Sequence, residues 1–322
     1  MCRLHSIAEK SGIERKLYCR ELIARFGHAL ALNWNIGEEN TQSSREIIEM
    51  SEFIRVTDPY RHPIVLHTFP QEQEKVYQPL LGKESPLTGL SLQNSWDNVH
   101  QRTLHWIRQS GASGKPWVVA NDEQNPAGLG VPPDPGYQGH DGVAATKGGK
   151  GSSSEGYSKS KAYTLDDIRK LTLWGNLMAG GAGVEYYFGY SLPENDLLCE
   201  DLRSRDRSWD YCRIALDFFR EKKIPFAEMS NANEMIGNSK NDNSKYCFAK
   251  YGEIYLVYLP AGGTTTLDLT AVPGTFSVSW FNPRAGGPLE AGSVKSIEAG
   301  KVVNVGHSPR DGSEDWLVVV RR

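Results

Sequence analysis

The spacing of hydrophobic and polar residues changes once along this chain, near residue 224. Before that point, apolar residues three or four positions apart alternate with short apolar runs, which predicts helices alternating with buried strands. After it, apolar residues recur at every second position, as in Ile254, Leu256 and Tyr258, between turns that contain glycine or proline. We therefore expect an α/β domain over residues 1–223 and an antiparallel β-sandwich over residues 224–322.

The first region contains about five expected strand and helix units. Strands are expected at 29–40, 62–67, 90–96, 115–123 and 184–190, and helices at 12–27, 42–54, 99–107, 164–178 and 209–219. Polar or aromatic residues end the strands: Glu38 and Glu39, His67, Gln93 and Asn94, Asp122 and Glu123, Tyr186 and Tyr187. In a (β/α)-barrel the carboxyl ends of the strands form the active-site face, so we expect these side chains to meet there. Residues 124–162 lack an apolar period, which indicates a loop over the site or an insertion.

Composition and charge narrow the classes of function. A net charge of −3 offers no basic excess for a nucleic acid. No apolar run reaches the length of about 20 residues that crosses a bilayer. The five cysteines include no CxxC pair, and no histidine stands at metal-ligand spacing, so neither a metal nor another cofactor is expected. Residues 1–16 are polar and show no apolar core of a signal peptide.

Two carboxylate pairs are the candidates for catalysis, Glu38 with Glu39 and Asp122 with Glu123. Glycoside hydrolysis needs two carboxyl groups that flank the bond to be broken, one as acid/base and one as nucleophile. Aromatic and polar residues near the same strand ends suit contacts with sugar rings and hydroxyl groups. The expected substrate contacts are Trp34, His67, Asn94, Trp96, Tyr186 and Tyr187. The alternative is an ordinary structural role: a solvated turn for the acids, and core packing or capping for the others.

Two segments carry a resemblance to a known family. LYCRELIARFGHALALNWNIGEEN at 17–40 resembles the third helix and fourth strand of barrel glycoside hydrolases of clan A, especially the apiosidase-like group. The resemblance implies that Glu39 is the acid/base, with the choice between Glu38 and Glu39 left open. KPWVVANDEQ at 115–124 is similar to the strand that carries the nucleophile in that group, which implies Glu123, with Asp122 as the alternative. LWGNLMAGGAGVEYYFGY at 173–190 resembles the approach to the eighth strand.

The second region resembles a β-sandwich that follows such barrels and is labelled collagen-binding. The segments that carry this likeness are YLVYLPAGGTTTLDL, FSVSWFNPRAGG and DWLVVV. The combined resemblance implies a retaining glycosidase that acts on a plant or algal type of polysaccharide or oligosaccharide, from an extracellular or periplasmic parent protein. The alternative function is an extracellular binding or adhesion protein that uses the sandwich to hold a glycan or collagen.

The alignment with strand four of a barrel has a structural consequence. If residues 33–39 form that strand, the chain contains a partial (β/α)8 TIM-type barrel, about strands four to eight, and lacks strands one to three. We then expect a fragment of a longer protein, or a gene whose start is placed too late, that is inactive or weakly active alone. A barrel that is not closed leaves an open sheet edge, which implies self-association through that edge.

Overall fold

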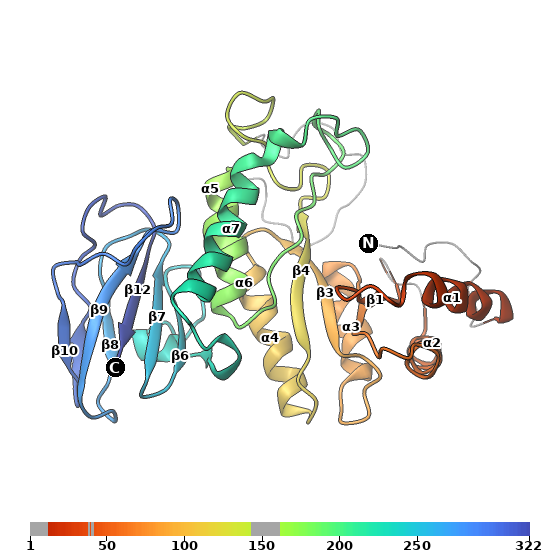
Figure 1. The fold of residues 1–322 in the computed structure, drawn as a ribbon, viewed down its shortest axis with the longest axis horizontal. Coiled ribbons are helices and arrows are strands. Elements are labelled where there is room, and N and C mark those ends of the chain that lie inside the picture. The colour runs from red at the N-terminus through yellow and green to blue at the C-terminus, as the bar shows by residue number, and fades with distance from the viewer. Residues whose placement is uncertain (1–11, 38, 40–41, 143–161) are drawn as a thin grey trace.

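The computed structural model describes residues 12–37, 39, 42–142 and 162–322, and Glu38 lies outside the described residues. Within them, the first region forms a parallel sheet in the order β1-β2-β3-β4 (Figure 1). Its strands are β1 (Trp34–Asn35), β2 (Ile64–Leu66), β3 (Gly89–Ser95) and β4 (Val118–Asn125). Val184 adds an isolated parallel bridge to Asn121 of β4. The sheet is parallel, as the alternation of strands and helices predicts.

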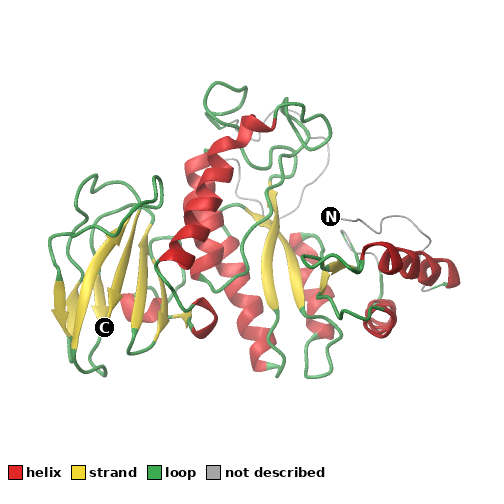
Figure 2. Cartoon of the chain, viewed as in Figure 1, coloured by secondary structure: helices red, strands yellow, loops and turns green. Residues whose placement is uncertain are grey.

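Helices connect these strands and cover them (Figure 2). The α-helices are α1 (Ile13–Phe26), α2 (Ser44–Thr57), α3 (Gln73–Tyr77), α4 (Val99–Ala112), α5 (Leu165–Asp167), α6 (Trp174–Met178) and α7 (Asp206–Glu221). Short 3₁₀ turns are η1 (Pro70–Glu72), η2 (Gln78–Leu80), η4 (Leu202–Arg205), η5 (Phe226–Glu228) and η6 (Asn233–Ile236), and a π-helical stretch, η3 (Ile168–Leu173), joins α5 to α6. Capping boxes start α2 and α5, because Ser43 bonds reciprocally with Glu46 and Thr164 with Asp167.

Two expected strands are shorter than the apolar pattern predicts. The first shrinks to β1, and Leu30, expected to be buried, is 98% exposed. The last reduces to the single bridge at Val184, since Gly183 and Gly189 adopt positive φ angles that interrupt an extended strand. The expectation of strands over 29–40 and 184–190 was therefore wrong for the other described residues of these ranges.

The second region contains a six-stranded antiparallel sheet in the order β10-β9-β12-β7-β6-β5 and a two-stranded antiparallel sheet of β11 and β8. The strands are β5 (Ser230–Asn231), β6 (Tyr246–Lys250), β7 (Ile254–Leu259), β8 (Thr266–Asp268), β9 (Thr275–Phe281), β10 (Ser296–Glu298), β11 (Val302–Asn304) and β12 (Trp316–Arg321). The expected antiparallel class is confirmed.

The central strands of the larger sheet are buried on both faces. In β7, Tyr255, Val257 and Leu259 belong to the core of the second region. Their neighbours Ile254, Leu256 and Tyr258 belong to a different cluster, which includes α6 and α7. Alternate residues of β7 thus point to two different faces of the sheet, and both faces are buried. In a sheet with one face in water, the same alternation would separate buried residues from exposed ones.

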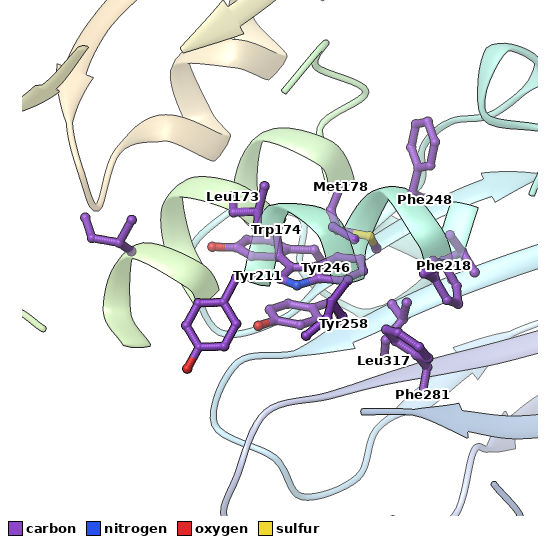
Figure 3. Close-up of a cluster of buried hydrophobic side chains, with 14 of the residues drawn as sticks. Leu173, Trp174, Met178, Tyr211, Phe218, Tyr246, Phe248, Tyr258, Phe281 and Leu317 are labelled. Carbon is purple, nitrogen blue, oxygen red and sulfur yellow. The ribbon is translucent and has the colours of Figure 1, made fainter. Parts of the chain in front are cut away.

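The shared cluster joins the two regions (Figure 3). Trp174 of α6 stacks on Tyr258 with ring centroids 5.3 Å apart, and Phe218 of α7 lies 4.5 Å from Phe281. The helices α6 and α7 lie between the parallel and antiparallel sheets (Figure 1). The expected boundary near residue 224 therefore falls inside a continuous apolar interface.

Candidate active site

A cavity of about 390 Å³ opens where β1, β2, β3 and β4 present polar side chains. On the strand side it is lined by Asn35 of β1, His67 directly after β2, Ser91 of β3, and Asp122 and Glu123 of β4. The opposite wall is supplied by Glu185, Tyr186, Tyr187, Gly189, Tyr190, Asp196 and Leu197. The combination of several carboxylates with aromatic rings gives the cavity a polar floor and a partly apolar wall.

Glu123 is fixed in this cavity by its neighbours on adjacent strands. The residue is almost buried, at 7% exposure. The amide Nε2 of Gln93 donates to Glu123 Oε1 at 2.5 Å, and the other carboxylate oxygen, Oε2, lies 3.5 Å from His67 Nε2. His67 Nδ1 lies 3.3 Å from the hydroxyl of Ser91. Gln93 on the adjacent strand β3 thus holds one oxygen of the Glu123 carboxylate, and His67, directly after β2, lies beside the other.

A β-bulge explains how both acids of β4 reach the cavity. Consecutive residues of a regular strand point to opposite faces. Here the pairing with β3 shifts, because Leu92 pairs with Asn121 while the next residue, Gln93, pairs with Glu123. Asp122 is the extra residue of the bulge, so it lines the cavity together with Glu123.

A buried glutamine supports the bulged end of β3 from behind. Gln73 of α3 donates through Nε2 to the backbone carbonyl of Gln93 at 2.9 Å and to Asn94 Oδ1 at 3.0 Å. Its own Oε1 accepts hydrogen bonds from Arg102 and from Trp106 Nε1. These contacts fix the backbone of the residue that positions Glu123.

Glu39 follows the first strand in the sequence, and Glu38 lies outside the described residues. Asn35 of β1 lines the cavity, and the carbonyl of Gly37 accepts a hydrogen bond from the backbone N–H of His67 at 3.3 Å. The chain thus stays beside β2 as far as Gly37. Glu39 is partly buried and has a φ of 44°, and it is not among the residues that line the cavity.

Three of the expected substrate contacts lie elsewhere. Trp34 is buried and donates from Nε1 to Asp58 Oδ2 at 3.0 Å. Trp96 stacks on Tyr163 in the apolar cluster, with centroids 4.8 Å apart. Asn94 is buried and accepts a hydrogen bond from Gln73. Packing accounts for Trp96, and packing with a hydrogen bond accounts for Trp34. Asn94 is bonded through Oδ1 only, and its buried Nδ2 has no hydrogen-bond partner among the described residues. None of the three lines the cavity.

The other expected contacts do line the cavity, namely His67, Tyr186 and Tyr187. Burial raises the pKa of the Tyr186 phenol, and the neighbouring Cys212 side chain raises that pKa further. Its ring lies 6.2 Å from the ring of Trp209 of α7. Tyr186 is therefore held in its un-ionised form against the helix while it lines the wall.

The sequence patterns did not point to several lining residues. Asn35, Ser91, Glu185, Asp196 and Leu197 all border the cavity. Ser91 stands two residues before the expected polar end of its strand, and Glu185 stands directly beside the two tyrosines that the pattern singled out. The polar residues 194–196 (END), within the segment after Gly189, are the one local signal for the far wall.

The described residues hold neither a candidate metal site nor a membrane-spanning helix. Among them, no group of three His, Cys, Asp or Glu side chains gathers as a metal site. Likewise, none of the helices of the described part of the chain is long and apolar enough to cross a membrane.

Solved structures with a similar fold include glycoside hydrolases. One described as a glycoside hydrolase matches with a TM-score of 0.67 at 14% identity, over 96% of this chain and 69% of that chain. A family 5 glycoside hydrolase from Bacteroides vulgatus ATCC 8482 matches with a TM-score of 0.66 at 15% identity, over 97% of this chain and 66% of its own. An α-amylase from Anoxybacillus has a TM-score of 0.50 at 10% identity, over 96% and 63% of the two chains. The chain thus spans about two thirds of the length of these proteins or slightly less.

The sequence comparisons concern the second region. Residues 231–321 match the family model described as "Putative collagen-binding domain of a collagenase". Among curated proteins, no sequence matches the chain. The likeness to solved structures and the family match confirm the expected relationship: this chain has the fold found in glycoside hydrolases, and its second region is similar to the collagen-binding-type domain.

Proposed function

We propose that this chain carries the catalytic acids of a retaining glycoside hydrolase. The observation that carries the proposal is Glu123, an almost buried carboxylate at the floor of a cavity of about 390 Å³, held by Gln93 and His67. A nucleophilic carboxylate must present one oxygen to the anomeric carbon without rotating away, and this hydrogen bonding restrains such rotation. The fold of the solved relatives supports the same class of reaction.

In the proposed mechanism Glu123 is the nucleophile and Glu39 the acid/base. Glu39 protonates the glycosidic oxygen while a Glu123 oxygen attacks the anomeric carbon, so the glycosidic bond breaks and a glycosyl ester forms. Glu39 then removes a proton from water, the water oxygen attacks the same carbon, and the ester bond to Glu123 breaks. Net retention of configuration follows from the two inversions.

The second carboxylate of the proposed pair is Glu39. Glu39 follows β1, whose Asn35 lines the cavity, and Glu38 stays an alternative. Asp122 and Glu185 are further acids on the cavity wall. Replacing the acid/base changes the pH dependence of turnover and slows substrates with poor leaving groups most. A substrate with a good leaving group loses little activity in that variant, because its leaving group needs no protonation.

His67, Tyr186 and Tyr187 are the proposed contacts with the sugar. All three line the cavity with Glu123, and their polar atoms suit hydroxyl groups while the tyrosine rings suit the face of a sugar. We propose a plant or algal type of polysaccharide or oligosaccharide as the substrate, and an extracellular or periplasmic location for the parent protein.

We also infer that the parallel sheet is part of a (β/α)8 barrel, corresponding to about strands four to eight. Two features support this: the fold of the relatives, of which the chain spans about two thirds, and β1, which pairs within the described residues only with β2. In this proposal further strands complete the sheet beside β1, and the edge of β1 that has no strand partner among the described residues favours self-association. We do not propose adhesion through the sandwich as the main function, because the acid-lined cavity lies in the first region.

The test compares this chain with a version that is longer at its N-terminus. Both are assayed on a panel of plant and algal polysaccharides, and NMR follows the anomeric configuration of the products. Glu123→Ala is expected to lower turnover by several orders of magnitude, and added azide to restore activity by forming a glycosyl azide of inverted configuration. Glu84→Gln, a change at an exposed acid before β3, is the control expected to retain full activity. Full activity of Glu123→Ala would refute the assignment. Inversion in the wild-type product would refute the retaining mechanism.

A further inference from the structure

The far wall of the cavity continues into an exposed apolar rim. Tyr190 and Leu197 line the cavity, yet their residues are 58% and 79% exposed, and the next residue, Leu198, is 72% exposed. A single exposed leucine is ordinary on a protein surface. Here Tyr190 and Leu197 border the cavity that holds Glu123, and Leu198 follows Leu197 directly in the chain, so three exposed apolar side chains come from one short segment at this cavity.

This rim is held in place by its backbone. Asn195 is buried, and its Oδ1 accepts hydrogen bonds from the backbone N–H groups of Leu197 and Leu198 at 2.9 and 3.2 Å. Its Nδ2 donates to the carbonyl of Leu192 at 2.6 Å. One side chain therefore fixes both leucine backbones while the leucine side chains stay in water.

A second set of bonds ties the rim to the wall of the cavity. The N–H of Asp196 donates to the carbonyl of Gly189 at 3.2 Å, and Asp196 Oδ2 accepts from the N–H of Phe188 at 3.2 Å. Gly189 has a φ of 71° and packs so closely on the backbone of Gly128 that an added Cβ would lie 2.6 Å from its carbonyl oxygen. The segment is thus built as one hydrogen-bonded unit, and the exposure of the leucines is a feature of its fold.

The chemistry of the rim differs from that of the floor. Sugar hydroxyl groups need hydrogen-bonding partners, and Asn35, His67 and Glu123 are present on the floor. Leucine side chains offer neither a donor, an acceptor nor an aromatic face for a sugar ring. They contribute binding free energy only when an apolar group covers them and removes their surface from water.

We propose that Tyr190, Leu197 and Leu198 form a subsite for an apolar alkyl group attached to the sugar, so that the chain favours glycosides with a hydrophobic aglycone. The inference rests on the proposed function, since it places the sugar over Glu123 and its aglycone on the rim. We choose this ligand because Leu197 and Tyr190 line the same cavity as Glu123, so a group attached to a bound sugar can reach them.

The test is binding, measured by calorimetry on the Glu123→Gln variant so that hydrolysis does not interfere. Hexyl and methyl glycosides of the same sugars, in both anomers and below micelle-forming concentration, are compared. At least one hexyl glycoside is expected to bind about tenfold or more tightly than its methyl partner. Adding Leu197→Asn and Leu198→Asn is expected to remove most of that preference, read as the ratio of the hexyl to the methyl glycoside affinity. Leu216→Asn, at a leucine of α7 that is 70% exposed, is the matched control and should keep the preference.

Each outcome decides one proposal. Equal binding of hexyl and methyl partners, absence of binding by every hexyl glycoside, or a preference that survives both asparagine substitutions would overturn the rim subsite. If the extended wild type hydrolyses polysaccharides but shows no hexyl preference, the subsite alone fails. If it shows the preference but cleaves no glycoside, the proposed function alone fails, and the rim stands as a binding site.

Discussion

The buried charge at the junction of the two regions gives the most direct test of the packing. Asp315 is fully buried and accepts from Arg169 through both oxygens, at 2.8 Å from Nη2 and 3.2 Å from Nε. Tyr258 donates its hydroxyl to Asp315 Oδ2 at 2.6 Å. Burial alone would lower the pKa of Arg169, but the charge and hydrogen bonds of Asp315 outweigh it and raise that pKa. The native state thus holds a buried arginine that depends on one carboxylate.

We expect Asp315→Asn to destabilise the chain by about 3 kcal/mol. Removing one partner of a buried pair typically costs about 3–5 kcal/mol, because the remaining charge stays buried. The lower end applies here, since Arg169 keeps its contacts with Asp166 and with the ring of Tyr211, 4.6 Å away. Tyr258→Phe removes only one hydrogen bond to the carboxylate, and its expected cost is about 1.5–3 kcal/mol.

The assay is urea unfolding followed by tryptophan fluorescence. Asp311→Asn is the control, because Asp311 lies on the same loop but is exposed, and its distant ion pairs are worth about 0.5 kcal/mol or less. Replacing the whole pair with Arg169→Met and Asp315→Leu should recover much of the loss. A cost of Asp315→Asn no larger than that of Asp311→Asn would refute this account of the interface.

The remaining predictions concern the site, a buried histidine and a helix cap. Gln93→Ala removes the 2.5 Å bond to Glu123 and should lower kcat/KM about 10- to 100-fold on any glycoside that the extended protein cleaves, measured by steady-state kinetics. Burial lowers the pKa of His100 to about 4, so the unfolded chain, with a pKa of about 6.5, binds the proton first. This residue should therefore remove on the order of 3 kcal/mol of stability as pH falls from about 6.5 to 4, and the pH dependence of unfolding should shrink in His100→Gln. Ser43→Ala breaks the capping box of α2 and should cost about 1 kcal/mol in the same unfolding assay; no change would show that the cap is dispensable.

The fold class and the main helices follow from local periodicity, and the two short strands show its limit. The helix expected at 209–219 appears as α7, because a pattern of apolar residues over a full helix length records one buried face. The run at 29–40 looks apolar enough for a strand, yet only Trp34 and Asn35 pair with β2, and Leu30 faces water. Strand pairing depends on the neighbouring strand as well as on the residues themselves. The length of an apolar run therefore does not determine the length of the strand.

The lining of the site was predictable only where it follows a strand end. His67 and the acids of β4 were expected at the cavity because parallel strands end at one edge. The contact of Glu123 with Gln93 depends on a β-bulge, and no residue in the sequence marks that bulge. The far wall, from Glu185 to Leu197, is brought in by bonds between distant segments, and these lie beyond any local pattern.

The second region supports the cavity through a short series of contacts. Trp174 packs in the core shared with the sandwich, and two residues later on the same helix Asn176 accepts from the N–H of Gly183 at 2.7 Å. Gly183 and Glu185 in turn bond to the backbone of Asn121 in β4, at 3.1 and 3.0 Å. Helix α6 packs on the sandwich, and through Asn176 it holds Gly183. The start of the cavity wall therefore lies against β4, the strand that carries Glu123. Whatever that region binds, its packing on α6 already gives it a role in the geometry of the proposed active site.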